Sequence, residues 1–277
     1  MSLETASEES VDPRERFKEE LHKARELWPE GRLTQEQLAR KLRISKTAVS
    51  RLERGEGAIP RGVPARLDEV FGTDGLFQRL HEAMLAQDFP ARFQQRMALE
   101  RTATEVWEWA PNVIPGAFQE RGYAHSLIRA GMPSAPEVKI ERLTSARVAR
   151  REAFDRPSPP DVRLLLGEST LRLQPVAPDA MRRQLALLLR HVERATTSIR
   201  IVPWSAKPNL LMDYPISILR GAKGSQVVCV EQYRTASLLT DPDDVRNAVQ
   251  AFVDLSGEAR SAAESAALIR DQMERLK

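Results

Sequence analysis

Apolar residues recur every three or four positions through the first ninety residues of the chain, which is the spacing of one face of an α-helix. The first run consists of Phe17, Leu21, Ala24 and Trp28 and predicts a helix over 13–28. Comparable runs predict two short helices between Thr34 and Gly55, a fourth helix from Val63 and a fifth near Leu76. The N-terminal region is therefore predicted to be an all-α unit of five helices.

The two short helices carry clear start and stop signals. Thr34 is a favoured N-cap, and Gln37 three residues later completes a capping box. Ser45 is the predicted N-cap of the second helix, and Gly55 follows that helix as a stop signal. The sequence therefore predicts two helices joined by a tight turn.

The outward face of the second short helix carries cations and small hydroxyl groups, a combination that suits the major groove of DNA. We expect base edges to be read by Lys46, Thr47, Ser50 and Arg51, with Arg51 as the reader of guanine. We expect DNA phosphates to be contacted by Gln35, Lys41, Arg54 and Arg61. Gln35 belongs to this group because it sits at a helix N-terminus, where an anion is stabilised. The plainer interpretation is a solvated corner of a helical bundle.

The segments T-Q-E-Q-L-A, S-K-T-A-V-S and R-L-E-R-G, with Ile44 in the turn between the helices, resemble the helix-turn-helix of phage-repressor-type regulators, the XRE family. The resemblance implies a compact five-helix head that binds double-stranded DNA. One position departs from the family, because Arg43 opens the turn where glycine is common. A left-handed backbone at that position costs a non-glycine residue about 1 kcal/mol.

Strand-like and helix-like patterns follow one another beyond residue 98. Trp107 and Trp109 alternate as in a strand, further strands are predicted within 162–173 and 198–204, and two apolar runs predict a hairpin over 216–232. Helices are predicted from Tyr123 to Gly131, over 140–154 and 178–195, and from Thr240 or Asp241 towards the C-terminus. The predicted fold class is therefore α+β, with an all-α five-helix head followed by a mixed α/β C-terminal domain.

We divide the chain into four parts. Residues 1–12 are small and acidic and are expected to be disordered. Residues 13–86 are the predicted DNA-binding domain, 87–98 a linker, and 99–277 a C-terminal regulatory and dimerisation domain.

Several segments of the second region resemble the C-terminal domain of WhiJ-like actinobacterial regulators. They are W-E-W-x-P-N-V-I-P-G-A-F-Q, R-x-x-R-R-E-A-F, L-L-L-G-E-S-T-L, I-R-I-V-P-W and L-L-T-D-P-D-D-V. In that family an XRE head is joined to a domain of unknown function. The resemblance implies a transcriptional regulator of development or antibiotic production. It also implies a small acidic partner protein encoded nearby, in an antitoxin-like arrangement.

Composition changes this picture only slightly. Apolar residues make up 42% of the chain, enough for a sizeable core, and the net charge is +3. The single cysteine, Cys229, excludes an intramolecular disulfide and suits a reducing compartment. Its valine neighbours favour a buried thiol. No apolar run is long enough to span a bilayer, so we expect a cytoplasmic, nucleoid-associated protein without membrane contact.

The sequence shows no signature of catalysis, and we expect no enzymatic activity, metal or cofactor. The four histidines are scattered without neighbours at metal-ligand spacing, and the G-E-S segment at 167–169 lacks the second glycine of a nucleophile elbow. Two groups are candidates for a ligand or partner surface: Trp107 with Trp109, and Arg147 with Arg150 and Arg151. The plainer interpretations are a buried tryptophan pair and a solvated arginine-rich helix face.

A single helix-turn-helix reads only a few base pairs, so useful specificity usually takes two heads on a palindrome. We therefore expect a homodimeric, sequence-specific transcriptional regulator whose C-terminal domain supplies the dimer contact and senses a partner or ligand. The alternative is an antitoxin-like interaction protein that binds a small acidic partner protein and autoregulates its operon.

Overall fold

A computed structural model describes residues 12–56, 59, 60, 62–87, 91–173, 175–222, 224–232 and 235–276. The chain divides into an N-terminal unit, residues 1–88, and a C-terminal unit, residues 89–277. Among the described helices, none combines the length and the apolar character that crossing a membrane requires. The expected disorder of residues 1–12 falls almost wholly outside the described residues, which begin at Asp12.

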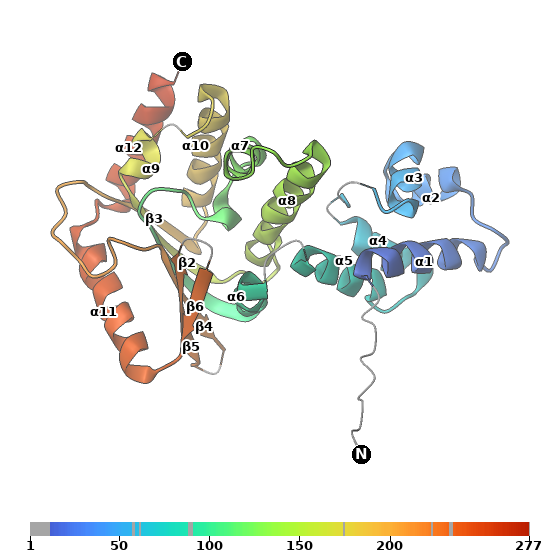
Figure 1. The fold of residues 1–277 in the computed structure, drawn as a ribbon, viewed down its shortest axis with the longest axis horizontal. Coiled ribbons are helices and arrows are strands. Elements are labelled where there is room, and N and C mark those ends of the chain that lie inside the picture. The colour runs from blue at the N-terminus through green and yellow to red at the C-terminus, as the bar shows by residue number, and fades with distance from the viewer. Residues whose placement is uncertain are drawn as a thin grey trace. The chain divides into compact units, whose positions relative to one another are not determined.

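The N-terminal unit consists of the five predicted helices (Figure 1). They are α1 (Pro13–Glu26), α2 (Gln35–Leu42), α3 (Lys46–Glu53), α4 (Val63–Phe71) and α5 (Leu76–Gln87). Their apolar faces meet in one core, in which the rings of Phe17 and Phe77 pack edge to face with centroids 5.3 Å apart. This contact joins the first helix to the last.

Asp68 of α4 caps the start of α5. Its carboxylate accepts hydrogen bonds from the backbone N–H groups of Phe77 (2.9 Å) and Gln78 (3.0 Å) and from the hydroxyl of Thr73 (2.5 Å). Burial raises the pKa of Asp68, but these bonds outweigh burial and hold the pKa below its ordinary value.

The C-terminal unit is built on a mixed six-stranded sheet in the order β3-β2-β1-β4-β5-β6. The strands are β1 (Ala103–Ala110), β2 (Asp161–Gly167), β3 (Thr197–Val202), β4 (Ile216–Gly221), β5 (Gln226–Gln232) and β6 (Thr235–Leu239). Strands β1, β2 and β3 pair in parallel, and β4, β5 and β6 continue the sheet antiparallel. The predicted hairpin over 216–232 is confirmed as β4 and β5.

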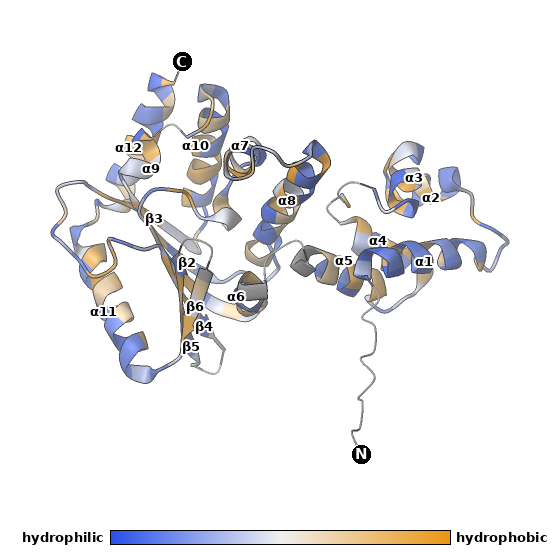
Figure 2. Ribbon diagram, in the orientation of Figure 1, coloured by the Kyte–Doolittle hydropathy of each residue, from blue (hydrophilic) through white to orange (hydrophobic). Residues whose placement is uncertain are grey.

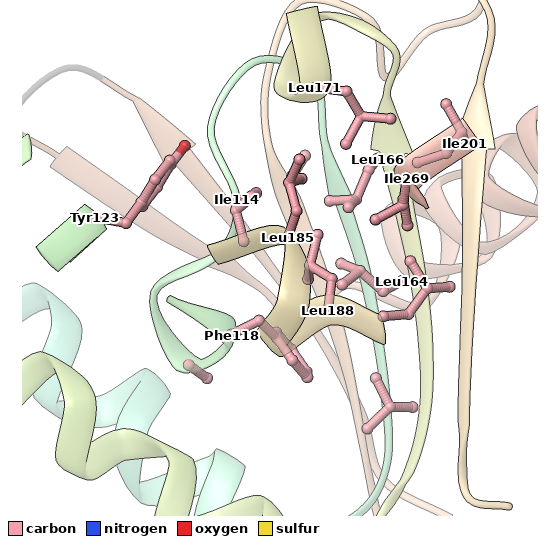
Figure 3. Close-up of a cluster of buried hydrophobic side chains, with 14 of the residues drawn as sticks. Ile114, Phe118, Tyr123, Leu164, Leu166, Leu171, Leu185, Leu188, Ile201 and Ile269 are labelled. Carbon is pink, nitrogen blue, oxygen red and sulfur yellow. The ribbon is translucent and has the colours of Figure 1, made fainter. Parts of the chain in front are cut away.

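Helices cover both faces of this sheet (Figure 1). The helices of the unit are α6 (Ala91–Thr102), α7 (Arg121–Gly131), α8 (Glu137–Ala149), α9 (Ser169–Arg172), α10 (Pro178–Val192), α11 (Pro242–Glu258) and α12 (Ala262–Arg275), with short 3₁₀ turns at Gly116–Phe118 and Arg150–Phe154. Leu185 and Leu188 of α10 and Ile269 of α12 pack onto Leu164 and Ile201 on one face (Figure 3). The other face packs against α11.

Hydropathy colouring shows why the sheet lies inside, since apolar residues run along its central strands while the helices carry polar and apolar faces (Figure 2). The predicted α+β class is confirmed. The structure differs from the sequence analysis at several elements. The helix predicted towards the C-terminus is two helices, α11 and α12, and helix α9 was not predicted. Strand β6 was not predicted, and much of the expected linker, 87–98, belongs to helix α6 of the C-terminal unit.

Candidate functional site

The helices α2 and α3 and the turn between them are fixed by caps. The Thr34 hydroxyl accepts from the Gln37 backbone N–H (3.2 Å), and the Gln37 side-chain oxygen accepts from the Thr34 N–H (2.8 Å). The Ser45 hydroxyl accepts from the Ala48 N–H (3.1 Å). Arg43 has φ 55° and ψ 44°, the left-handed conformation that the comparison with glycine predicted. Both predicted N-caps are confirmed.

A buried polar cluster holds α3 against the rest of the unit. The Arg25 guanidinium forms an ion pair with the Glu53 carboxylate and donates to the Leu33 carbonyl (2.8 Å). The second Glu53 oxygen accepts from the Gln35 side-chain amide (2.6 Å). Gln35 thus has one side-chain amide hydrogen and its N-terminal backbone N–H left to offer a phosphate.

The outer face of α3 carries three exposed polar side chains, those of Lys46, Thr47 and Arg51. Thr47 and Arg51 lie one helical turn apart, Lys46 precedes Thr47, and the helix buries Val49 and Leu52. In the described part of the chain, none of the three has a hydrogen-bond or ion-pair partner. The face is therefore available to donate hydrogen bonds to an acceptor outside the protein.

The remaining predicted contacts of the N-terminal unit differ in how freely they are presented. The half-buried Ser50 hydroxyl accepts from the Arg54 guanidinium (2.5 Å), which also pairs with Glu56 (2.9 Å). The exposed Lys41 ammonium lies over the Trp28 ring, 5.1 Å from its centroid. Arg61 lies outside the described residues.

Trp107 and Trp109 lie in the core of the C-terminal unit, each 4% exposed. The Trp109 indole N–H donates to the Leu211 carbonyl (2.6 Å), and the Trp107 ring packs on Phe252 with centroids 5.2 Å apart. The buried rings have little area to offer a partner protein, and their part in a ligand or partner surface stays a prediction.

The three arginines after residue 146 are partly buried rather than spread on a solvated helix face. Arg150 pairs with Glu100 (2.6 Å), Arg151 donates to the backbone carbonyl of Gln119 (2.6 Å), and Arg147 lies 3.5 Å from the Gln119 side-chain oxygen. The 3₁₀ turn that follows α8 directs these side chains into their own unit. The expectation of an outward arginine face is corrected accordingly.

A buried charge cluster lies between α6 and the sheet and comprises Arg96, Glu100, Glu108, Arg150 and Glu231. Arg96 donates to Glu108 (2.6 Å) and Glu231 (2.5 Å) and lies 3.0 Å from Glu100. Burial raises the pKa of Glu108 to about 7, Arg96 opposes the rise, and the neighbouring Glu100 adds to it. The cluster has three carboxylates and only two guanidinium groups, so the protonated form of Glu108 is favoured.

The sequence analysis missed this cluster. Its one available signal was Glu108, a carboxylate between two tryptophans in a strand that is otherwise mostly buried. The register then places Glu108 beside Ser217, and Ser217 beside Cys229. Cys229 is fully buried as expected, and burial raises the pKa of its thiol to about 11.

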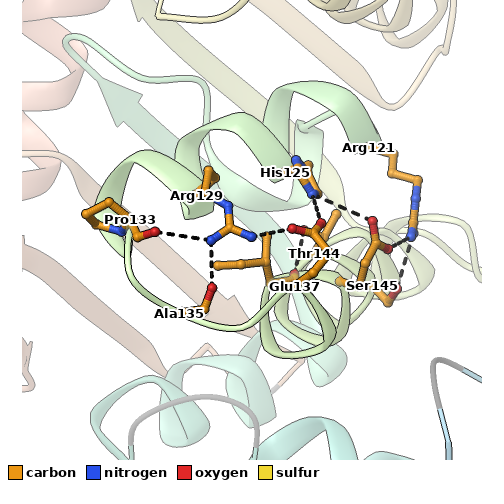
Figure 4. Close-up of polar contacts among 10 residues, drawn as sticks. Arg121, His125, Arg129, Pro133, Ala135, Glu137, Thr144 and Ser145 are labelled. Carbon is orange, nitrogen blue, oxygen red and sulfur yellow. Dashed lines mark hydrogen bonds and ion pairs between the residues drawn. The ribbon is translucent and has the colours of Figure 1, made fainter.

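The fold also brings together one histidine and two carboxylates that are separated in the sequence (Figure 4). His125 Nε2 of α7 lies 2.8 Å from Glu137 and 3.7 Å from Glu141, both of α8, and the three potential ligand atoms lie within 4.8 Å of one another. The other oxygen of each carboxylate is held by an arginine, Arg129 for Glu137 and Arg121 for Glu141. The group acts as an ion-pair network that ties α7 to α8.

Comparison with known protein families assigns both units. Residues 16–80, which span most of α1 through α5, match a helix-turn-helix domain. Residues 93–271, more than half of the chain, match a domain of unknown function, DUF5753. Neither the curated proteins nor the solved structures contain a match. The exposed face of α3 thus lies in a domain of a DNA-binding type, and the chain belongs to the DUF5753 family.

Proposed function

We propose that the protein is a sequence-specific transcriptional regulator of the XRE, WhiJ-like type that binds double-stranded DNA as a homodimer. The observation that carries the proposal is the exposed face of α3, where Lys46, Thr47 and Arg51 have no hydrogen-bond or ion-pair partner among the described residues. A short helix with such a face fits the major groove. The role is binding rather than catalysis, at the nucleoid in the cytoplasm.

The side chains of α3 divide into two groups. Lys46, Thr47 and Arg51 reach base edges, with Arg51 bidentate to guanine, and Ser50 contributes a weaker contact because Arg54 already bonds its hydroxyl. The phosphates are contacted by Gln35, Lys41, Arg54 and Arg61. Arg54 contacts a phosphate best when its ion pair with Glu56 is broken, because the Glu56 carboxylate neutralises the Arg54 charge in the free protein.

A homodimer follows from the size of the reading helix. A helix of eight residues spans about 12 Å, which covers only a few base pairs of a groove. Two heads on a palindrome double the number of bases read, and a two-fold dimer matches such an operator. The C-terminal unit is the part proposed to supply the dimer contact and the regulatory input.

The decisive experiment is a gel shift of the purified protein on its own upstream DNA with random DNA as competitor. We expect a specific shift that saturates at two chains per operator. A protein that binds both DNAs equally, with no ordered footprint, contradicts sequence-specific regulation.

An interaction protein that binds a small acidic partner is the second candidate. It is favoured by three exposed apolar side chains between β3 and β4, namely Trp204 (68% exposed), Leu210 (84%) and Tyr214 (47%). Exposed apolar groups so close together in the chain favour contact with another protein. The two candidates differ in whether co-expression of the small acidic protein encoded nearby is needed for the gel shift.

A further inference from the structure

Arg147, near the end of α8, is partly buried and has no carboxylate at ion-pair distance among the described residues, although the charge of Glu231 favours its charged form. Its one polar contact among the described residues is the Gln119 side-chain oxygen at 3.5 Å, the outer limit of a hydrogen bond. Burial, followed by repulsion from Arg150, lowers the pKa of Arg147 to about 10. Partial removal of an unpaired cation from water carries a cost, and a bound anion would reduce it.

Arg150 lies beside Arg147 and also has donor capacity to spare. Its Nε and Nη2 atoms bond to Glu100, whereas no acceptor in the described chain contacts its Nη1 atom. Both arginines pack against Gly116, because a Cβ there would lie 2.8 Å from Arg150 Nη1 and 3.6 Å from Arg147 Cγ. The absence of a side chain at Gly116 lets the Arg150 guanidinium and the aliphatic stem of Arg147 approach the same turn.

The neighbouring carboxylates are engaged by other guanidinium groups. Glu100 bonds both Arg96 and Arg150, while Glu108 and Glu231 bond Arg96. Each of the three is therefore bonded to a guanidinium other than that of Arg147. The free donors of Arg147 and Arg150 therefore remain open to an acceptor outside the described residues, and both residues are only partly buried.

We propose that Arg147 and Arg150, beside Gly116, form a binding site for a small-molecule oxyanion carrying a carboxylate or phosphate group. A guanidinium presents a planar fork of N–H donors that matches two oxygens of such an anion. The oxyanion bonds Arg147 and the Nη1 atom of Arg150 and supplies the missing negative charge. The site is independent of the proposed DNA contact, which lies on α3 in the other unit.

The test is isothermal titration of the DNA-free, full-length protein with sodium phosphate and with sodium succinate, in sodium chloride of matched ionic strength. We expect saturable binding of at least one of the two anions, and the stronger of them identifies phosphate or carboxylate as the ligand class. The Arg147→Gln variant should bind about tenfold more weakly or worse, since hydrogen bonds to a charged group are lost. Lys139→Gln, an exposed cation of the same helix, should bind like the wild type.

Two further variants keep the result decisive. Arg147→Lys retains the charge but loses the fork, so a folded Arg147→Lys protein with weakened anion binding supports the site even where Arg147→Gln is unstable. Arg51→Gln removes a cation of the α3 face and should leave anion binding unchanged. Binding that disappears in Arg51→Gln, survives in Arg147→Gln, or is absent for both anions overturns the proposal. A protein that fails to bind DNA does not contradict the proposed anion site.

Discussion

Arg51 is the exposed guanidinium on α3 best placed to read a base, because it has no partner within the described residues. Arg51→Ala should lower the affinity for the operator by about 1–3 kcal/mol and relax the preference at one base pair. Binding to random DNA should change less, since a base contact contributes little there. Competition gel shifts with single-base operator variants measure both effects.

Lys41→Ala is the matched control for this base contact. Its ammonium is proposed to meet a phosphate, so all sequences should lose affinity alike and the salt dependence should become shallower by about one unit. Equal losses on operator and random DNA for Arg51→Ala would reject its base-reading role.

Glu108 makes the stability of the C-terminal unit depend on pH in an unusual direction. Its pKa is about 7 in the folded chain against an ordinary value of 4.5. The protonated group therefore contributes stability fully at low pH, and this contribution is lost as the pH rises from 4.5 to 7. Since Gln resembles the protonated acid, Glu108→Gln should gain stability relative to the wild type over this range, on the order of 2–3 kcal/mol.

Urea unfolding at a series of pH values, followed by tryptophan fluorescence, measures this difference. Glu105→Gln, on the same strand but half-exposed, is the control and should show no such gain. Parallel stability curves for the wild type and Glu108→Gln would show that Glu108 is ionised throughout.

At the scale of the element, the turn between α2 and α3 stores strain at Arg43. A left-handed conformation costs a non-glycine residue about 1–2 kcal/mol, and substitution by glycine removes this cost. Part of the gain is offset, because glycine has greater conformational freedom in the unfolded chain. Arg43→Gly should therefore stabilise the N-terminal unit by about 0.5–1 kcal/mol in thermal unfolding. Arg40→Gly, exposed inside α2, should instead destabilise it by about 1 kcal/mol, and the same sign for both variants contradicts the argument.

Elements with local signals were predictable from the sequence, and elements defined by distant partners were not. The caps at Thr34 and Ser45 lie within three residues of the groups they bond, so their helices could be placed. Strand β6 is a short segment whose structure depends on pairing with β5. Asp68 likewise caps a helix that begins eight residues later.

The same distinction separates the two candidate sites. Periodicity alone distinguishes the exposed residues of α3 from Val49 and Leu52. The inward course of Arg147 and Arg150 depends on Gly116 and Glu100, which lie more than thirty positions earlier in the chain. No spacing rule connects such residues before the chain has folded.

At the scale of the whole molecule, the division into two units separates the reading of DNA from the proposed control of assembly. The proposed reading helix belongs to residues 1–88, and the buried charge cluster and Arg147 belong to residues 89–277. We expect an input to the C-terminal unit to change DNA binding by changing how two heads are presented together. The spacing of the operator half-sites is the observable that reports this presentation.

A homodimer held by its C-terminal units should require its two half-sites at a fixed rotation about the DNA axis. Inserting about five base pairs turns one half-site to the opposite face, so operator affinity should fall about tenfold or more, whereas inserting about ten should restore much of it. Binding to an isolated half-site is the control and should be unaffected by either insertion. Affinity that is indifferent to both insertions would mean that each head binds alone. In that case the C-terminal unit would act through a partner protein rather than through a second copy of the chain.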